Sequence, residues 1–337
     1  MSNEFHPTAS GAPSSSSLPF ASGVFLAGPT AAGKSAVALA LAQRIGGEII
    51  SVDSMQVYRG MDIGTAKLGP EELRRARHHI IDVAGLEERF DAARFVELAG
   101  GAAAEIRSRG RVPIFCGGTG LYFKAFREGL GDAPPADAAL RAELENRPLA
   151  ELLAELEKTD PAIFQRIDRQ NARRVIRAVE VIRLTGKPFS AQRASWNGTK
   201  AGVAGYYFGL TRPAGELRER IARRVDEMFA RGLVVETQSL LARGLAENPT
   251  AMQALGYRQV VEHLRGLRTL PETIELVKIR TRQFAKRQLT WFRRQMRLEW
   301  ISLEGKPAEA AAEELAARLC PDLGSARALA CRVQRPR

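Results

Sequence analysis

The sequence contains little cysteine and histidine. Three of its 337 residues are cysteine, and Cys116, Cys320 and Cys331 lack the paired spacing of a disulfide framework or a zinc site. The four histidines do not form a metal-binding pattern either. Scattered thiols suit a reducing compartment, so we expect a cytoplasmic protein.

Long hydrophobic runs are also missing. No apolar stretch approaches the length of a membrane span, so we expect no membrane association. The N-terminus lacks a basic region followed by an apolar one, so we expect no secretory signal. An apolar fraction of 45% is typical of a globular protein.

Acidic residues are fewer than basic ones. The chain has 50 Lys and Arg residues against 38 Asp and Glu residues, a formal net charge of +12. A charge of this size favours a polyanionic partner, most simply a nucleic acid. The alternative is a basic protein that is merely soluble.

A phosphate-binding motif is the most informative stretch that is present. Its eight residues are Gly28, Pro29, Thr30, Ala31, Ala32, Gly33, Lys34 and Ser35, which fit G-x-x-x-x-G-K-[ST]. An apolar strand pattern precedes the motif and a helix-forming stretch follows it, as a phosphate loop requires. Backbone amides and Lys34 would then hold a di- or triphosphate, and the Ser35 hydroxyl suits a Mg²⁺ ion that bridges phosphate oxygens.

The order of strand and helix patterns predicts an α/β fold. We expect a P-loop-type parallel sheet core flanked by helices, with strands over 24–27, 48–52, 78–83, 112–116, 205–210 and 299–303. Helical periodicity without strands fills the region from about 136 to 186, which predicts an all-helical insertion domain. Ligands of such folds lie at the carboxyl ends of the strands.

We divide the chain into four parts. Residues 1–22 are rich in Ser, Pro and Ala and are expected to be a disordered extension. Residues 23–130 and 201–310 are expected to form the catalytic core, with long helices near its end. Residues 131–200 form the expected helical insertion, and residues 311–337 a C-terminal tail.

Two loops after predicted strands carry candidate catalytic groups. Asp53 follows the second strand, where a carboxylate could accept a proton, hold a metal ion or simply cap a turn. The strand ending at Cys116 is followed by Gly117-Gly118-Thr119, without the Asp that helps many nucleotide hydrolases to hold Mg²⁺. The glycines and the Thr119 hydroxyl suit a phosphate or a leaving oxygen, or form a plain tight turn.

Two predicted helices are strongly basic. Arg218, Arg220, Arg223 and Arg224 lie on one helix, and one or two of them could reach a pyrophosphate. Residues 278–297 contain eight Lys or Arg, no acidic residue, and interleaved aromatic residues. Such a helix suits contacts with RNA phosphates and bases, although a solvated basic face with aromatic residues in the core would have the same pattern.

Together these motifs resemble the tRNA dimethylallyltransferase family, also called tRNA isopentenyltransferases. The matching stretches are GPTAAGKS (28–35), SVDSMQVYRGMDIGTAK (51–67), GGTGLYFKA (117–125), RRVIRAVEV (173–181), ALGYRQV (254–260) and RQFAKRQLTWFRR (282–294). They span the chain from about Val24 to Leu303.

The resemblance implies transfer of the dimethylallyl group from dimethylallyl diphosphate to N6 of the adenine 3′-adjacent to the anticodon of tRNA, with release of diphosphate. Asp53 would be the general base, Thr119 would lie beside the leaving oxygen, Arg224 would contact the diphosphate, and Mg²⁺ would be the cofactor. The tRNA-contacting positions would be Asp53, Ser54, Met55, Gln56, Arg173, Arg174, Val175, Ile176, Arg177, Gln253, Gly256, Tyr257, Arg258, Lys286, Arg287, Gln288, Trp291 and Arg293. We expect a monomer.

Two other functions compete with this one. A P-loop small-molecule kinase would explain residues 24–120, but it gives no reason for the basic, aromatic helix near residue 290. A non-catalytic RNA-binding switch controlled by a nucleotide is the third possibility.

Overall fold

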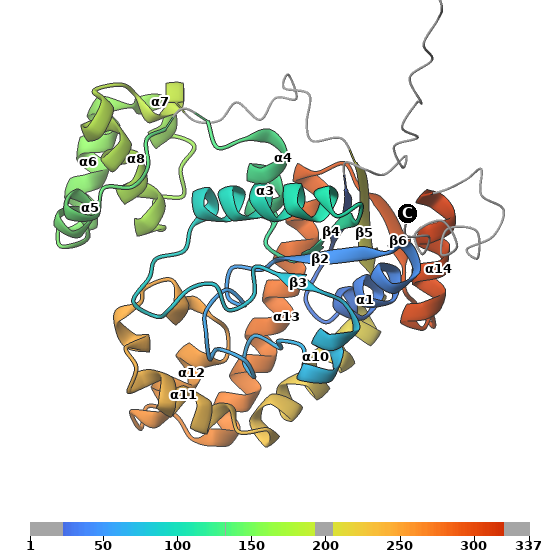
Figure 1. The fold of residues 1–337 in the computed structure, drawn as a ribbon. Helices are drawn as coiled ribbons and strands as arrows, with labels where there is room; N and C mark the ends of the chain where they lie inside the picture. The colour runs from blue at the N-terminus through green and yellow to red at the C-terminus, as the bar shows by residue number, and fades with distance from the viewer. Residues whose placement is uncertain (1–22, 132, 193–204, 320–337) are drawn as a thin grey trace, which may run out of the picture.

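Short apolar runs form the strands of one parallel sheet. In the computed structural model, which describes residues 23–131, 133–192 and 205–319, the strands lie in the order β3-β2-β4-β1-β5-β6 (Figure 1). The strands are β1 Val24–Ala27, β2 Gly47–Val52, β3 His78–His79, β4 Val112–Gly117, β5 Tyr206–Thr211 and β6 Glu299–Ser302. Every residue of β1, β2 and β4 is buried, because helices cover both faces of the sheet.

Helices form a layer on each face. One face is covered by α1 and α14, and the other chiefly by α3, α4 and α13. The helices of the core are α1 Lys34–Ile45, α2 Pro70–Arg75, α3 Ala92–Ser108, α4 Gly120–Glu128, α10 Ala214–Ala230, α11 Leu233–Leu241, α12 Tyr257–Leu264, α13 Leu270–Gln295 and α14 Ala308–Leu319, with short 3-10 turns at Leu245–Glu247 and Ala251–Gln253. Asp91 caps α3, and its carboxylate accepts the amide N–H groups of Ala93 and Arg94.

Aromatic rings tie the central strands together. Phe25 of β1 stacks on Phe115 of β4 at 4.5 Å and on Tyr207 of β5 at 4.3 Å between ring centroids. All three residues are in register across neighbouring strands. The strand that leads into the phosphate loop is therefore held from both sides.

A group of helices stands apart from the sheet. The helices α5 Ala138–Glu145, α6 Leu149–Thr159, α7 Pro161–Phe164, α8 Ala172–Thr185 and α9 Phe189–Gln192 lie beyond α4 (Figure 1). They share an apolar cluster that includes Leu144, Leu156 and Val179, all fully buried. On this basis we propose that residues 131–200 are an insertion with its own core.

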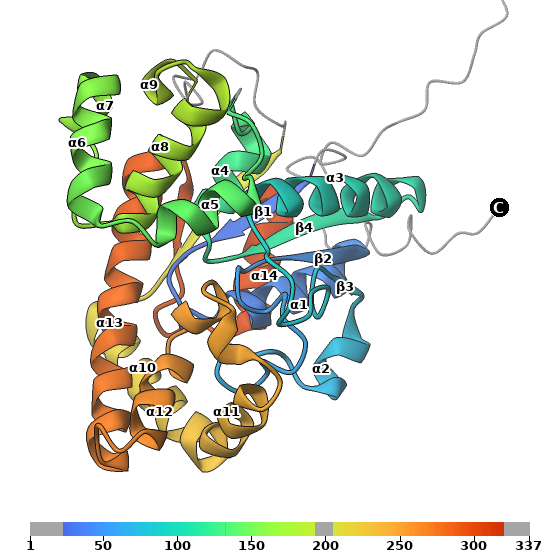
Figure 2. The same ribbon diagram turned by 90° about the vertical axis from the view of Figure 1, so that its left-hand side faces the viewer.

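The long helix α13 connects the parts of the molecule that surround the carboxyl ends of the strands. Its 26 residues span about 39 Å at the usual rise of an α-helix. Figure 2 shows it running from α12 up to the level of α8. It packs on α10, α12 and α4 along the way.

The predicted fold class is confirmed, with two differences in detail. The strand expected over 78–83 is only His78–His79, because Ile80 and Asp82 have positive φ angles of 62° and 56° and leave the extended conformation. Helix α14 was not predicted and includes residues assigned to the tail, but Leu315 and Leu319 bury it against α1. The predicted disordered extension, residues 1–22, lies outside the described residues. Within the described part of the chain, no helix has the length and apolarity to cross a membrane.

Candidate active site

The phosphate loop has the backbone conformation that its glycines allow. Gly33 has a φ of 101° and Gly28 a φ of 154°, and a Cβ on Gly28 would lie 2.3 Å from the carbonyl oxygen of Leu210. The carbonyls of Ala31 and Ala32 accept hydrogen bonds from Arg220 Nε at 2.9 Å and Arg212 Nε at 2.8 Å. With these carbonyls engaged, the amide N–H groups at the start of α1 are available to an anion.

Lys34 lies inside this loop. Its Nζ donates to the carbonyl oxygen of Pro29 at 2.7 Å. Burial lowers the pKa of Lys34 to about 8, and the positive charge of Arg224 acts in the same direction, while Cys116 and Asp53 oppose the shift. An anion bound in the loop would stabilise the protonated, positively charged form of Lys34.

Two of the four arginines on α10 face the loop. Arg224 Nη1 contacts Thr30 Oγ1 at 3.4 Å, and Arg220 holds the Ala31 carbonyl. Burial lowers the pKa of both guanidinium groups, and each is lowered further by a neighbouring arginine. Arg218 and Arg223 are exposed. The i, i+4 spacing of Arg220 and Arg224 therefore selects the pair that can meet a diphosphate.

Asp53 and Thr119 lie on two adjacent loops that are joined by hydrogen bonds. Asp53 Oδ1 accepts the N–H groups of Met55 at 2.8 Å and Gln56 at 3.2 Å, which fixes the carboxylate at the end of β2. Thr119 Oγ1 accepts the N–H of Ser54 at 3.1 Å. The turn-capping role considered for Asp53 is thus present, and it orients the carboxylate toward the cavities described below.

Gln288 of α13 bridges the phosphate loop and the loop that contains Thr119. Its Oε1 accepts the N–H of Thr30 at 2.8 Å, and its Nε2 donates to the carbonyl oxygen of Gly118 at 2.9 Å. A Cβ on Gly118 would lie 2.3 Å from Nε2, so glycine is required for this contact. The resemblance assigns Gln288 to tRNA binding, which stays a prediction; in the structure its side chain is buried and forms this bridge.

Two cavities meet beside Asp53. The first, about 240 Å³, is lined by Lys34, Ser35 and Arg220 and by Cys116 and Gly117. The second, about 390 Å³, has an apolar wall that includes Met55, Val225, Met228, Leu255 and Val277. The residues that line both cavities are Thr30, Asp53, Thr65, Ala66, Arg224, Phe284 and Gln288. A charged cavity and an apolar cavity therefore share a boundary that carries a carboxylate and a guanidinium group.

The first cavity fits a Mg²⁺ ion that would be coordinated mainly by the phosphate oxygens of a bound diphosphate. The exposed Ser35 and the half-buried Asp53 both line the first cavity, and their oxygens are the hard donors that Mg²⁺ prefers. Among the described residues, no three His, Cys, Asp or Glu side chains are grouped to hold a metal ion. Phosphate oxygens would have to complete the coordination.

The other residues assigned to tRNA by the resemblance differ in exposure. Near the second cavity, Ser54, Met55 and Gln253 line its wall, while Gln56 bonds to Ser51 Oγ and to the Thr65 carbonyl. At α12, Gly256 forms the turn before the helix with a φ of 95°, Tyr257 is fully buried and Arg258 is exposed.

On α8, Arg173 and Arg174 are exposed, and Arg177 pairs with Glu180 at 2.7 Å. Val175 and Ile176 are buried in the core of the helical group, so their side chains do not face an RNA surface.

On α13, Lys286, Arg287 and Arg293 are exposed, in keeping with the expected basic face. Trp291 is half-buried, and its indole packs so closely on Gly120 that a Cβ there would lie 2.2 Å from the ring. Phe292 is fully buried. Phe292 therefore belongs to the packing of α13, and the assignment of the half-buried Trp291 to tRNA binding stays a prediction.

The roles of Arg212 and Phe284 were not predicted from the sequence. Arg212 directly follows β5, the position where α/β folds gather ligand-binding groups, and this position was the available signal. Phe284 is 37% exposed and lines both cavities. The available sequence signal for Phe284 was its position among the basic residues of the predicted helix.

Comparisons with known proteins agree on one family. The family model described as IPP transferase matches residues 56–295. The chain is 46% identical over 281 residues to "tRNA dimethylallyltransferase 1" of Trichlorobacter lovleyi, covering 82% of this chain and 92% of the relative. It is 45% identical over 302 residues to "tRNA dimethylallyltransferase" of Symbiobacterium thermophilum, covering 88% of this chain and 94% of the relative.

Solved structures are similar as well. The tRNA isopentenylpyrophosphate transferase of Bacillus halodurans has a TM-score of 0.65 and 39% identity, covering 91% of this chain and 98% of that one. A eukaryotic dimethylallyltransferase acting on tRNA has a TM-score of 0.76 and 27% identity, covering 89% of this chain and 78% of that one.

The pKa of Lys34 leads to a prediction about stability. Between pH 8 and the ordinary value of 10.5, the unfolded chain still binds a proton that folded Lys34 has released, so raising the pH through this window stabilises the fold. Relative to Lys34→Met, the wild-type free energy of unfolding should rise by up to about 3 kcal/mol. Urea denaturation of both proteins across the window measures this, and a constant difference would contradict the shift.

Proposed function

The chain belongs to the IPP transferase family, and from this premise we propose that it transfers a dimethylallyl group to tRNA. The acceptor is N6 of the adenine 3′-adjacent to the anticodon, and the donor is dimethylallyl diphosphate. The observation that carries the proposal is the shared boundary of the two cavities, where Asp53 and Arg224 line both. A kinase is not favoured, since its phosphate acceptor would give no use to an apolar cavity of this size or to the basic face of α13.

The donor is held by its charge. The diphosphate occupies the first cavity against the loop amides, Lys34 and Arg224, with Thr119 beside the bridging oxygen. Ser35 and the diphosphate oxygens would hold Mg²⁺, which would neutralise charge on the leaving diphosphate when bound. Positive groups placed before reaction stabilise the charge that develops as the C1–O bond breaks.

The acceptor amine needs help from the protein. The lone pair of an exocyclic amine is delocalised into the purine ring, so N6 is a poor nucleophile. Asp53 orients the amine and takes its proton as the bond from N6 to C1 forms. Adenine must leave its stack to reach Asp53, and the free-energy cost of unstacking is lower in an RNA loop than in a duplex.

RNA binding is assigned to the exposed cations around the second cavity and on α13 and α8. Arg287 lines this cavity, and the exposed Lys286 and Arg293 line a separate groove between α10 and α13. The exposed Arg173 and Arg174 of α8 lie on the helical group (Figure 2). We further propose a cytoplasmic monomer.

The experiment that tests the function uses two labelled donors in parallel. The protein is incubated with unmodified tRNA and radiolabelled dimethylallyl diphosphate, and separately with labelled ATP. Label in tRNA at the adenine next to the anticodon supports the transferase. Phosphate transfer from ATP would support the kinase, and tRNA binding without either product would support an RNA-binding switch.

Asp53→Ala should abolish transfer while tRNA is still bound, because the variant loses the proton acceptor and keeps the cations that grip RNA. Single-turnover transfer and tRNA binding are measured on the same preparation. Loss of a general base typically costs about 10²- to 10⁴-fold in rate. Transfer at the wild-type rate would remove Asp53 from this role.

Lys286→Ala and Arg293→Ala should each weaken tRNA binding and reduce the slope of log affinity against log salt by roughly one. Arg318→Ala is the matched control, since Arg318 lies on α14 at the opposite face of the sheet. Binding is measured by titration between low and high salt. Unchanged affinity in both test variants would mean that this face of α13 does not meet RNA.

A further inference from the structure

A loop without regular secondary structure forms part of the boundary between the two cavities. We call residues 61–67 the junction loop. Its Thr65 and Ala66 line both cavities, and Gly64 lines the second. Ala66 has a φ of 52°, which is uncommon for a residue with a side chain. Neighbouring side chains must therefore keep the loop in this conformation.

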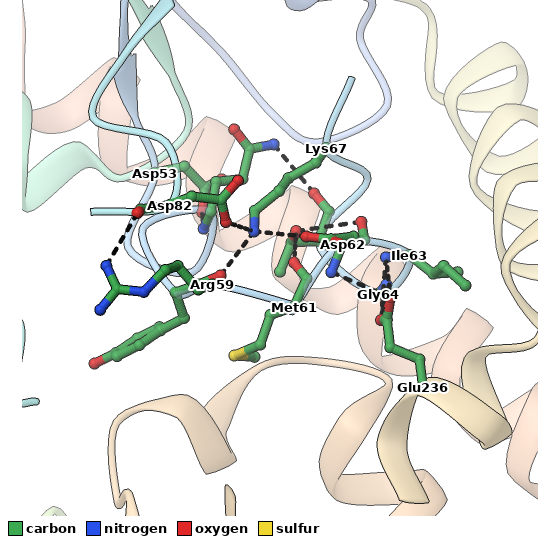
Figure 3. A network of polar contacts seen from close by, with 12 residues as sticks. Asp53, Arg59, Met61, Asp62, Ile63, Gly64, Lys67, Asp82 and Glu236 are labelled. Atoms are coloured by element: carbon green, nitrogen blue, oxygen red, sulfur yellow. Dashed lines mark hydrogen bonds and ion pairs between the residues drawn. The ribbon is translucent and has the colours of Figure 1, made fainter. Parts of the chain in front are cut away.

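Glu236 of α11 holds the first half of the junction loop. Its carboxylate accepts three consecutive backbone N–H groups, from Asp62 at 3.3 Å, Ile63 at 2.8 Å and Gly64 at 3.3 Å. Consecutive amides of this kind form a concave anion site. Here the anion is the chain's own carboxylate (Figure 3).

Tyr257 adds a second layer to this contact. Its hydroxyl donates to Glu236 Oε1 at 2.6 Å and accepts the N–H of Gly64 at 3.1 Å. Burial, together with the hydrogen bond to Glu236, raises the pKa of the Tyr257 hydroxyl, which keeps it protonated as a donor. The buried tyrosine thus fixes the Glu236 carboxylate against the loop.

Lys67 holds the other end of the junction loop. Its side chain is only 5% exposed, and its ammonium group donates to the Tyr58 carbonyl at 2.7 Å and pairs with Asp62 at 2.7 Å and with Asp82. Both ends of the loop are therefore anchored. Thr65 and Ala66 lie between the anchors and face the cavities.

We propose that Glu236 is a positioning residue for the transfer reaction. It holds Thr65 and Ala66 in place, and these two residues set the width of the boundary between the cavities at which the donor carbon is aligned with the acceptor amine. This inference rests on the proposed function. Glu236 is absent from the lining of both cavities and would act only through the loop. A displacement of about 1 Å at a reacting centre can cost 10²-fold in rate.

The decisive variant is Glu236→Gln, which preserves size but replaces one acceptor oxygen by an N–H₂ group facing loop amides. We expect kcat for dimethylallyl transfer to fall roughly 10- to 100-fold. The dissociation constant for inorganic pyrophosphate should stay at the wild-type value, because the phosphate loop is untouched. The ratio of kcat/KM for dimethylallyl over geranyl diphosphate should also fall, because a loosened wall excludes the longer chain less well.

Glu272→Gln is the matched control. Glu272 also accepts a backbone N–H, that of Thr269 at 2.8 Å, but it caps the start of α13 away from the cavities. The control should lower Tm without changing kcat per folded molecule or the donor ratio. Tyr257→Phe is a second test that removes one hydrogen bond from Glu236, and we expect a smaller fall in kcat in the same direction.

Wild-type kcat and donor ratio in Glu236→Gln would overturn the proposal and leave Glu236 with a role in stability only. If that variant does not fold, wild-type constants in Tyr257→Phe would overturn it. Absence of transfer by the wild-type protein would instead overturn the proposed function, so the two failures are distinguishable.

Discussion

The side-chain amide of Gln288 is the contact on which the geometry of the site depends. It joins Thr30 of the phosphate loop to Gly118 of the neighbouring loop, and both of its polar atoms are used. Because Gln288 belongs to α13, this contact also fixes the basic helix relative to the sheet. A buried amide that lost either partner would leave a backbone group unsatisfied, at a cost of roughly 1–3 kcal/mol. The donor site and the face assigned to RNA are therefore parts of one rigid arrangement.

The positively charged side chains around the first cavity repel one another when no anion is bound between them. Burial and mutual repulsion lower the pKa values of Lys34, Arg220 and Arg224, and Arg212 stands beside them. A diphosphate relieves this repulsion, and so does the negative charge that grows on it during reaction. Asp53 directly follows β2 and lines both cavities, so its carboxylate can take a proton beside the apolar cavity. The arrangement separates a charged leaving group from an apolar alkyl group within one continuous space.

Much of this could be predicted from the sequence, for identifiable reasons. The phosphate loop, the parallel sheet and the Asp91 cap follow local rules of spacing and residue type, and the structure has all three. Helix α14 was missed although its Ala and Leu residues are good helix formers, because its packing on α1 depends on tertiary contacts. The bridging role of Gln288 joins residues 258 positions apart and has no local signature. The same holds for Glu236, whose partners lie about 173 positions earlier. For Trp291, pattern alone could not separate a stacking residue from a packing residue.

In the proposed reaction, donor and acceptor meet at the boundary of the two cavities, beside Asp53. The most direct measurement is a crystal structure of the protein with an unreactive thiolo analogue of dimethylallyl diphosphate and an anticodon stem-loop. We expect the diphosphate to lie on the amides of Gly33, Lys34 and Ser35, and the extruded adenine to place N6 within hydrogen-bond distance of the Asp53 carboxylate. An adenine bound elsewhere, or a diphosphate outside the phosphate loop, would contradict the proposed reaction.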